Sequence, residues 1–359
     1  MCDDAEGAED AVKSAPSASD AAWLRVAIST VRPNCSIANI SSAEAGGRRS
    51  TAIVRFADAE PIVVRGEQNG VDGGSVATEG VLLRAITDET TVPVATPLGW
   101  GSIADEPATG RDGDQSVGAG DEWIATRFIE GDNLHERFCR LGSAERRDIV
   151  GTFGRYLGEL HAGFRFDGYG QIVAENGTLR IGSGSNSEER PSGNAWHDWL
   201  VDRGRESLDR LPTEFDDIAE AARNRLDEWS VEAAPVPRLF PWDLRPGNAL
   251  VSDGEITAII DWESPLAAGA ALSVAKAEYL LADWYVPDEA DALRRAFRAG
   301  YTEVRSLPVV DDVHRIVAVA ETAVDSGGQV TNPRYPPINR DAAVQFHRKY
   351  LGSAAGDNE

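Results

Sequence analysis

Short apolar runs separated by polar turns fill the first part of the chain, which is the pattern of a small β-sheet. The runs are rich in β-branched residues, and they predict strands at residues 36–40, 50–56, 61–65, 92–98 and 123–129. The second and third runs are joined by four residues and predict a hairpin. Residues 76–86 instead carry apolar side chains at helical spacing. This portion is therefore expected to be a sheet with one helix.

From Ser143 onward the spacing of the apolar residues becomes helical. The segments with this period are 143–162, 196–211, 214–229, 271–284, 289–302, 310–324 and 341–351. Two glycine-rich stretches, 101–120 and 167–187, are expected to be a surface loop and an irregular segment. The pattern predicts an α+β fold with two lobes, residues 21–130 with a small antiparallel sheet and residues 131–359 mainly helical, behind a disordered acidic tail at 1–20.

Composition narrows the classes of protein that this chain can be. The formal net charge of -24 argues against nucleic acid or an anionic membrane as a partner, because both require a basic surface. The acidity is spread along the chain, and lysine occurs only as Lys13, Lys276 and Lys349. This combination is typical of a protein adapted to concentrated salt, where charge repulsion is screened. With no signal segment or membrane-length apolar run, we expect a cytoplasmic protein.

Candidate chemistry is concentrated in residues 239–263, which interrupt the helical pattern. Asp243 and Asn248 lie in a polar loop, and a predicted hairpin, 249–251 with 256–260, returns the chain so that Asp261 follows its second strand. Two carboxylates and an amide oxygen that converge at strand ends would suit Mg²⁺, which would stabilise the expected buried charge of Asp261. Alternatively, the three residues are ordinary turn formers and a helix cap.

The same stretch resembles a known family. Its D-L-R-P-G-N and I-I-D-W-E segments are similar to the H-G-D-x-x-x-x-N and I-D-W-E motifs of the aminoglycoside phosphotransferase family, small-molecule kinases with a protein-kinase-like fold. The resemblance implies that Asp243 is the catalytic base and that Asn248 and Asp261 bind magnesium, with Glu263 assisting. It implies transfer of the γ-phosphoryl group of ATP, or of GTP, to a hydroxyl of a small molecule.

The resemblance extends upstream and assigns candidate nucleotide-binding residues. Gly46 and Gly47 would belong to the loop that covers the phosphates, and Arg65 stands where kinases place the phosphate-contacting lysine, with Glu79 as its partner. The remaining candidates would present hinge backbone to the base; they are Phe128, Ile129 and Glu130.

Two departures from the family pattern leave a second interpretation open. Pro241 and Trp242 stand where the family has His-Gly, and Ala270 and Ser273 replace two aspartates that anchor the active-site backbone in relatives. Proline stiffness and tryptophan packing would then have to hold the loop. The alternative to an active kinase is a catalytically weak or inactive nucleotide-binding module. The sequence identifies neither the acceptor nor the oligomeric state.

Overall fold

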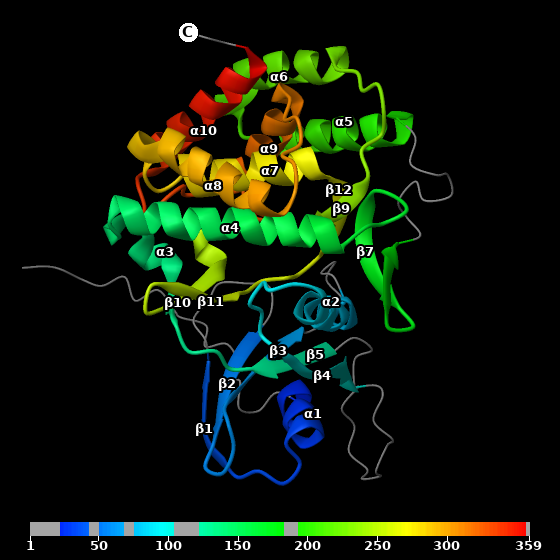
Figure 1. Ribbon diagram of the computed structural model, residues 1–359, viewed down its shortest axis with the longest axis vertical. Helices are drawn as coiled ribbons and strands as arrows, with labels where there is room; N and C mark the ends of the chain where they lie inside the picture. Colours follow the sequence, from blue (N-terminus) through cyan, green and yellow to red (C-terminus); the bar gives the residue numbers. More distant parts are fainter. Residues whose placement is uncertain (1–21, 43–49, 68–74, 104–121, 183–192, 357–359) are drawn as a thin grey trace, which may run out of the picture. The chain divides into compact units, whose positions relative to one another are not determined.

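The computed structural model describes residues 22–42, 50–67, 75–103, 122–182 and 193–356. Two compact units are present, Met1–Asp72 with Leu98–Phe128, and Gly73–Pro97 with Ile129–Glu359. The first is built on a sheet and the second is mainly helical (Figure 1). The α+β fold class predicted from the two periodicities is confirmed. No helix in the described ranges has the length and apolar character needed to cross a membrane.

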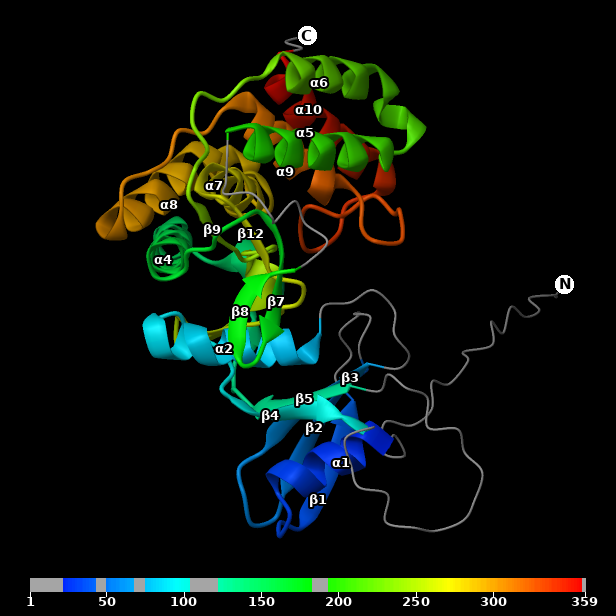
Figure 2. The same cartoon turned by 90° about the vertical axis from the view of Figure 1, so that its right-hand side faces the viewer.

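The first unit contains a five-stranded sheet in the order β1-β2-β3-β5-β4. The strands are β1 (Ile37–Ser42), β2 (Ser50–Phe56), β3 (Ile62–Glu67), β4 (Pro97–Ser102) and β5 (Glu122–Arg127). The predicted hairpin is confirmed, because β2 and β3 pair antiparallel with Ala52 opposite Val64. Helix α1 (Ala22–Val31) was not predicted; it buries Trp23 and Ile28 against one face of the sheet (Figure 2).

The strand predicted at residues 92–98 is wrong. Val94 forms a single bridge with Ile259, and Pro93 accepts a hydrogen bond of 2.7 Å from the Ile259 N–H. Regular pairing begins only at Pro97, at the start of β4. Proline has no N–H to donate to a ladder, so two prolines in seven residues restrict this segment to isolated contacts. The predicted loop also starts late, since residues 101 and 102 belong to β4; most of it, residues 104–120, lies outside the described residues.

The helices predicted in the second unit are confirmed, with shifts at their ends. Their bounds are α4 (Ser143–Gly163), α5 (Gly193–Asp209), α6 (Asp216–Glu228), α7 (Ala270–Glu278), α8 (Ala290–Val304), α9 (Asp312–Ala323) and α10 (Arg340–Ala355). Helix α2 (Val76–Glu89), also predicted, belongs to this unit, which adds the short α3 (Leu134–Arg137). A π-helical turn, Tyr279–Asp283, continues α7.

The prediction that residues 167–187 are irregular is wrong over most of its length. β7 (Gly170–Glu175) and β8 (Thr178–Ile181) form an antiparallel hairpin. Asn176 and Gly177 connect them with φ values of 53° and 74°, which is the left-handed conformation that two-residue hairpin turns require. The Asn-Gly pair was the sequence signal for this turn, and the many nearby glycines obscured it. Residues 183–187 lie outside the described residues.

Two small sheets in the second unit carry the loop that contains Asp243. One has the order β8-β7-β12-β9, with β9 at Pro237–Phe240 and β12, which was not predicted, at Leu266–Gly269. The other has the order β11-β10-β6, with β6 at Asp132–Asn133, β10 at Ala249–Ser252 and β11 at Glu255–Ile259. The hairpin predicted from residues 249–260 is therefore confirmed. Both ends of the loop are fixed by strands in different sheets.

Helices α4 and α8 lie side by side in the second unit (Figure 1), and glycine allows their close approach. A Cβ atom on Gly154 would lie 2.0 Å from the Phe297 carbonyl oxygen. Gly151, one turn earlier on α4, is different, because a Cβ there would meet nothing closer than the Ala296 carbonyl oxygen at 3.5 Å. The contact at Gly154 is too short for any side chain, since backbone is the obstacle.

We expect Gly154→Ala to lower the free energy of unfolding by about 3 kcal/mol, because the two helices must separate to admit one methyl group. Gly151→Ala is the matched control in the same helix. It should be neutral or stabilising by about 0.5–1 kcal/mol, the usual gain of alanine over glycine inside a helix. Denaturant unfolding measures both differences. Equal stability of the two variants would contradict the close packing at Gly154.

Candidate active site

The loop from Pro241 to Asn248 is held at both ends. Leu239, on the strand that precedes it, is buried and pairs with Ala267 of β12. The loop ends in a 3₁₀ turn, Pro246–Asn248, from which the chain enters β10. Asp243 lies in the middle of the loop, with 27% of its side chain exposed. The carboxylate is thus placed by fixed strands and remains accessible.

Asn248 connects this loop to the segment that carries Asp261. Its side-chain Nδ2 donates to the Asp243 carbonyl oxygen at 2.9 Å, and its own carbonyl oxygen accepts from the Ile260 N–H at 2.9 Å. The hairpin register continues this contact, with Ala249 opposite Ile259. The structure therefore brings the loop of Asp243, the amide of Asn248 and the chain immediately before Asp261 together.

The expectation that Asp261 is a buried carboxylate is wrong. The residue is exposed, and it follows β11 with a φ of 68°. β11 ends at Ile259, and Ile260 is already only half-buried, so the apolar run leaves the core before it reaches the aspartate. Glu263, two residues later, is half-buried. The question of how a buried charge is compensated at Asp261 therefore does not arise.

Two cations flank the Asp243 carboxylate. Lys276 Nζ, from α7, lies 3.1 Å from Oδ1, and Arg245 Nε lies 3.7 Å from Oδ2. Burial by itself would raise the pKa of Asp243, but the charges of Lys276 and Arg245 outweigh burial and hold the pKa below its usual value. Asp243 is consequently ionised at neutral pH, which is the form that can accept a proton.

Among the residues that depart from the family pattern, Trp242 has an unusual backbone conformation, and Ala270 and Ser273 are buried. Trp242 has a φ of 53°, in the left-handed region that glycine adopts easily and tryptophan does not. Ala270 and Ser273 are buried on α7, and Ser273 Oγ finds no hydrogen-bond partner within the described ranges. Neither position therefore supplies a strong anchor for the loop, and the left-handed tryptophan must be held by other contacts.

The remaining predicted site residues are distributed over both units. Arg65 lies on β3 in the first unit, and Glu79 is buried on α2 in the second, so their pairing stays a prediction. The Phe128 N–H donates to the Pro61 carbonyl oxygen at 3.3 Å, which engages one of the backbone groups expected to face a base. The Glu130 carbonyl oxygen accepts from Thr257 Oγ1 at 3.3 Å.

Ile129 is the first residue of the second unit's longer segment. Its predicted role at the hinge stays a prediction. Gly46 and Gly47, the predicted phosphate-covering loop, lie outside the described residues.

Sequence reasoning missed Lys276 and Arg245, the cations next to Asp243. Arg245 follows Asp243 by two residues and could have been noticed from its position. For Lys276 the available signal was its rarity, because one of the three lysines of the chain falls in an apolar helical segment. Nothing in that segment indicated which of its faces would meet the loop.

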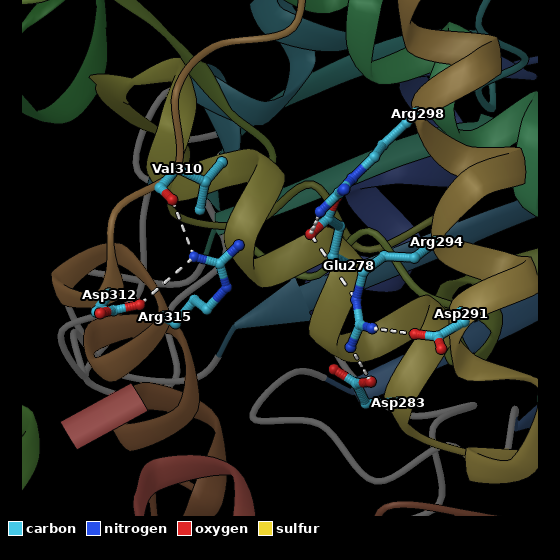
Figure 3. Close-up of polar contacts among 8 residues, drawn as sticks. All are labelled: Glu278, Asp283, Asp291, Arg294, Arg298, Val310, Asp312 and Arg315. Carbon is cyan, nitrogen blue, oxygen red and sulfur yellow. Dashed lines mark hydrogen bonds and ion pairs between the residues drawn. The ribbon is translucent and has the colours of Figure 1, made fainter. Parts of the chain in front are cut away.

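A separate cavity of about 470 Å³ lies on another face of α7, among α8, α9 and α10. Figure 3 shows Arg294, Arg298 and Arg315, which line it, turned toward carboxylates. Glu278, whose side chain is 4% exposed, accepts from Arg298 at 2.5 and 3.0 Å, and Arg294 binds Asp283 and Asp291. These carboxylates are compensated by arginine, and neither Asp243 nor Asn248 lines the cavity. We interpret it as an ion-pair network that stabilises the helices.

Comparison with known proteins gives one family match by sequence. The phosphotransferase enzyme family matches this chain over residues 46–307. Among curated proteins, no sequence match is found. Of the solved structures that are similar, that of aminoglycoside phosphotransferase APH(4)-Ia has a TM-score of 0.61 at 12% identity, covering 94% of this chain and 98% of that one.

Two further solved structures share the fold. The GDP and kanamycin complex of APH(2")-IIIa has a TM-score of 0.56 at 15% identity and covers 94% of this chain and 99% of that one. A putative fructosamine-3-kinase from Thermobifida fusca has a TM-score of 0.51 at 14% identity and covers 92% and 98%. At these identities the similarity concerns the fold alone, and it confirms the predicted two-lobed, kinase-like architecture.

Proposed function

Because this chain belongs to the phosphotransferase enzyme family, we propose that it transfers the γ-phosphoryl group of ATP, with Mg²⁺, to a hydroxyl group of a small molecule. The observation that carries the proposal is the hydrogen-bonded unit formed by the Asp243 loop, Asn248 and the end of the following hairpin. Such a unit would hold a base and oxygen ligands near each other, which is what positioning and charge neutralisation in phosphoryl transfer require.

Asp243 would act as the base of the reaction. Its ionised carboxylate accepts the proton of the acceptor hydroxyl as that oxygen forms a bond to the γ-phosphorus, while the bond from the γ-phosphorus to the bridging oxygen breaks and ADP leaves. The lowered pKa of Asp243 keeps the carboxylate in the accepting form at neutral pH. The remaining exposure of its side chain leaves room for the hydroxyl to approach.

Asn248 and Asp261 fit the ligand set of a magnesium ion, with Glu263 assisting. The Asn248 Nδ2 is committed to the Asp243 carbonyl oxygen, so the amide oxygen is directed elsewhere and is free of hydrogen bonds from the described residues. The part of the chain that the structure describes contains no cluster of three or more His, Cys, Asp and Glu side chains suited to a metal. Mg²⁺ is usually held by one or two carboxylates together with phosphate and water, so it does not need such a cluster. Bound there, it would neutralise charge on the transferred group.

The nucleotide would be bound by residues whose roles come from the family resemblance. Arg65 would contact the phosphates with Glu79 as its partner, Gly46 and Gly47 would cover them, and hinge backbone near Ile129 and Glu130 would bind the base. Relatives differ in the nucleotide with which they were solved, AMP-PNP for APH(4)-Ia and GDP for APH(2")-IIIa. We propose ATP as the donor, with GTP as the comparison in any assay, and hence a cytoplasmic location.

The acceptor is proposed only as a class, a small molecule with a hydroxyl group. Structurally similar proteins include complexes with hygromycin B and kanamycin as well as a putative fructosamine-3-kinase, so the fold serves acceptors of different chemistry. An antibiotic, an amino alcohol and a sugar are therefore all appropriate members of a first acceptor panel.

The second candidate is a nucleotide-binding module without turnover. It is favoured by Ser273, whose hydroxyl finds no partner among the described residues where an anchoring aspartate is expected, and by the left-handed Trp242. Either feature would allow nucleotide binding while the base is poorly placed. The two candidates predict the same binding but different turnover.

We expect Mg²⁺ and ATP together to raise the melting temperature of the protein in concentrated KCl by about 5 °C, when the nucleotide is at about 100 times its dissociation constant. ATP with a chelator, and Mg²⁺ without nucleotide, are the controls and should give smaller shifts. Thermal-shift measurements with ATP and GTP test this. No shift with either nucleotide would remove the proposal; a shift without turnover on the acceptor panel would favour the inactive module.

A further inference from the structure

Two cations lie close to the ring of Trp242. Lys276 Nζ is 4.2 Å from its centroid and Arg203 Cζ is 4.8 Å from it, while Phe240 meets the same ring edge-on with centroids 5.6 Å apart. Cation–π contacts of this kind strengthen when water is excluded. They supply the contacts that hold a tryptophan in a left-handed backbone conformation, which is strained for a residue with a Cβ atom.

The two cations share one buried carboxylate. Glu321 on α9 has 1% of its side chain exposed; it lies 3.7 Å from Lys276 Nζ and is in direct contact with Arg203. Lys276 itself is 3% exposed. Together with Asp243, these side chains form a group of two cations and two anions. Each of the two anions therefore has a cation beside it, which reduces the cost of burying the charges.

This group connects the loop to three helices. Arg203 comes from α5, Lys276 from α7 and Glu321 from α9, and α9 packs on both of the other helices. Lys276 is the member that reaches the loop twice, through the Asp243 carboxylate and through the Trp242 ring. Its neighbours Ala275 and Glu278 face the separate cavity on the other side of α7. Within this group, Lys276 thus joins the helix core to both Trp242 and Asp243.

We propose that Lys276, supported by Glu321 and Arg203, is a positioning residue that holds Asp243 Oδ1 and the Trp242 ring in place. It would take over the anchoring that His-Gly and the two aspartates provide in the family pattern. Lys276 binds one carboxylate oxygen from the interior, and Asp243 keeps part of its side chain exposed toward solvent. The catalytic consequence of this positioning rests on the proposed phosphotransferase function, whereas the contact itself does not.

Chemical labelling of lysine tests the contact without any turnover. Lys349 is exposed on α10, so an acylating reagent should modify it quickly in the native protein while Lys276 stays unmodified. Asp243→Asn and Glu321→Gln should each raise the labelling rate of Lys276 by about tenfold, because the amine loses a partner in the interior. Asp253→Asn, in the turn between β10 and β11, should leave that rate unchanged. Mass spectrometry reports each site separately.

Steady-state kinetics tests the consequence. Lys276→Met should lower kcat by about 100-fold and change the KM for Mg·ATP by less than about threefold, since the nucleotide contacts are elsewhere. Lys349→Met should match the wild type, and Lys276→Arg, which keeps the charge, should recover part of the loss. The Mg·ATP shift in melting temperature shows that each variant is folded; if Lys276→Met is not, Glu321→Gln takes its place.

The outcomes separate this inference from the proposed function. A wild type without turnover, in which Asp243→Asn nevertheless exposes Lys276 to the reagent, would contradict the phosphotransferase proposal and keep the contact. An active wild type whose Lys276→Met variant retains kcat would overturn the positioning role. Rapid labelling of Lys276 in the native protein would overturn the contact itself.

Discussion

Asp243→Asn should lower kcat by about a thousandfold and leave the binding of Mg·ATP within about threefold of the wild type. A positioned general base contributes about 10²–10⁴-fold to the rate, and an amide of the same shape cannot accept the proton. The proposed magnesium ligands, Asn248 and Asp261, are unchanged by this substitution. The nucleotide should therefore still bind, and the loss should appear in kcat.

Asp253→Asn is the matched control for this prediction. Asp253 lies in the exposed turn between β10 and β11 with a φ of 52°, a conformation that asparagine also adopts readily. The control makes the same chemical change ten residues further along the chain, outside the loop of Asp243, and it should retain full turnover. Turnover by Asp243→Asn near that of the control would show that Asp243 is not the base.

Asp243→Asn also removes a partner of the buried Lys276, so its stability must be measured beside its activity. Breaking one side of a buried ion pair commonly costs about 3–5 kcal/mol. Glu321 still lies 3.7 Å from the lysine, which should reduce the loss. Kinetics recorded well below the melting temperature of the variant would separate lost chemistry from lost folding.

The second unit should lose about 6 kcal/mol of unfolding free energy when the pH falls from 7 to 4.5, which is as large as the whole stability of a marginally stable protein. The reason is three buried histidines. Burial lowers the pKa of His161 to about 3 and the pKa values of His314 and His347 to about 4. At a pH between about 4 and 6.5, each of these histidines is therefore neutral in the folded protein and protonated in the unfolded chain.

The direction of this change in stability follows from proton uptake by the unfolded chain. The unfolded histidines bind protons below their ordinary pKa of 6.5, so the stability that neutral burial allows is present above that pH and is lost as the pH falls toward 4. One pKa unit corresponds to about 1.4 kcal/mol, so two units at three sites amount to roughly 8 kcal/mol. Asp283 opposes this with about 2 kcal/mol, because burial raises its pKa to about 6 and its protonation favours the fold.

Denaturant unfolding at pH 7, 5.5 and 4.5, at constant ionic strength, measures the loss. Asp283→Asn removes the one contribution named here that stabilises the fold at low pH. In this variant the free energy of unfolding should therefore fall more steeply with decreasing pH. Replacing His161 by Gln should make it shallower. A stability that is independent of pH over this range would contradict the buried neutral state of the histidines. Two of them have a tyrosine partner, since His161 Nδ1 contacts Tyr301 Oη at 2.8 Å and His347 Nδ1 contacts Tyr279 Oη at 2.6 Å.

The loop and hairpin around Asp243 were predictable because they are local. Asp243, Asn248 and Asp261 lie within nineteen residues, and the apolar runs on either side of the predicted turn fix the return of the chain. The hairpin and the contact of Ile260 with Asn248 follow from that register. The exposure of Asp261 did not follow, since a periodic pattern does not reveal where a strand leaves the core.

Two errors in the fold had local causes that were visible in the sequence. The turn Asn176-Gly177 was hidden by the glycines around it, although that dipeptide is a strong hairpin signal. In the segment 92–98 the apolar residues suggested a strand, but Pro93 and Pro97 limit its pairing. In both cases backbone chemistry outweighed the hydrophobic pattern.

The sequence by itself determined the two-lobed α+β fold and the hairpin that returns Ile260 to Asn248, because periodicity and turn residues act over a few neighbouring positions. Only the tertiary structure decided that Lys276, Arg203 and Glu321, which belong to three different helices, gather around Trp242 and Asp243. A helical period identifies an apolar face but not the partner of that face. Which charges meet in the interior depends on how the helices pack.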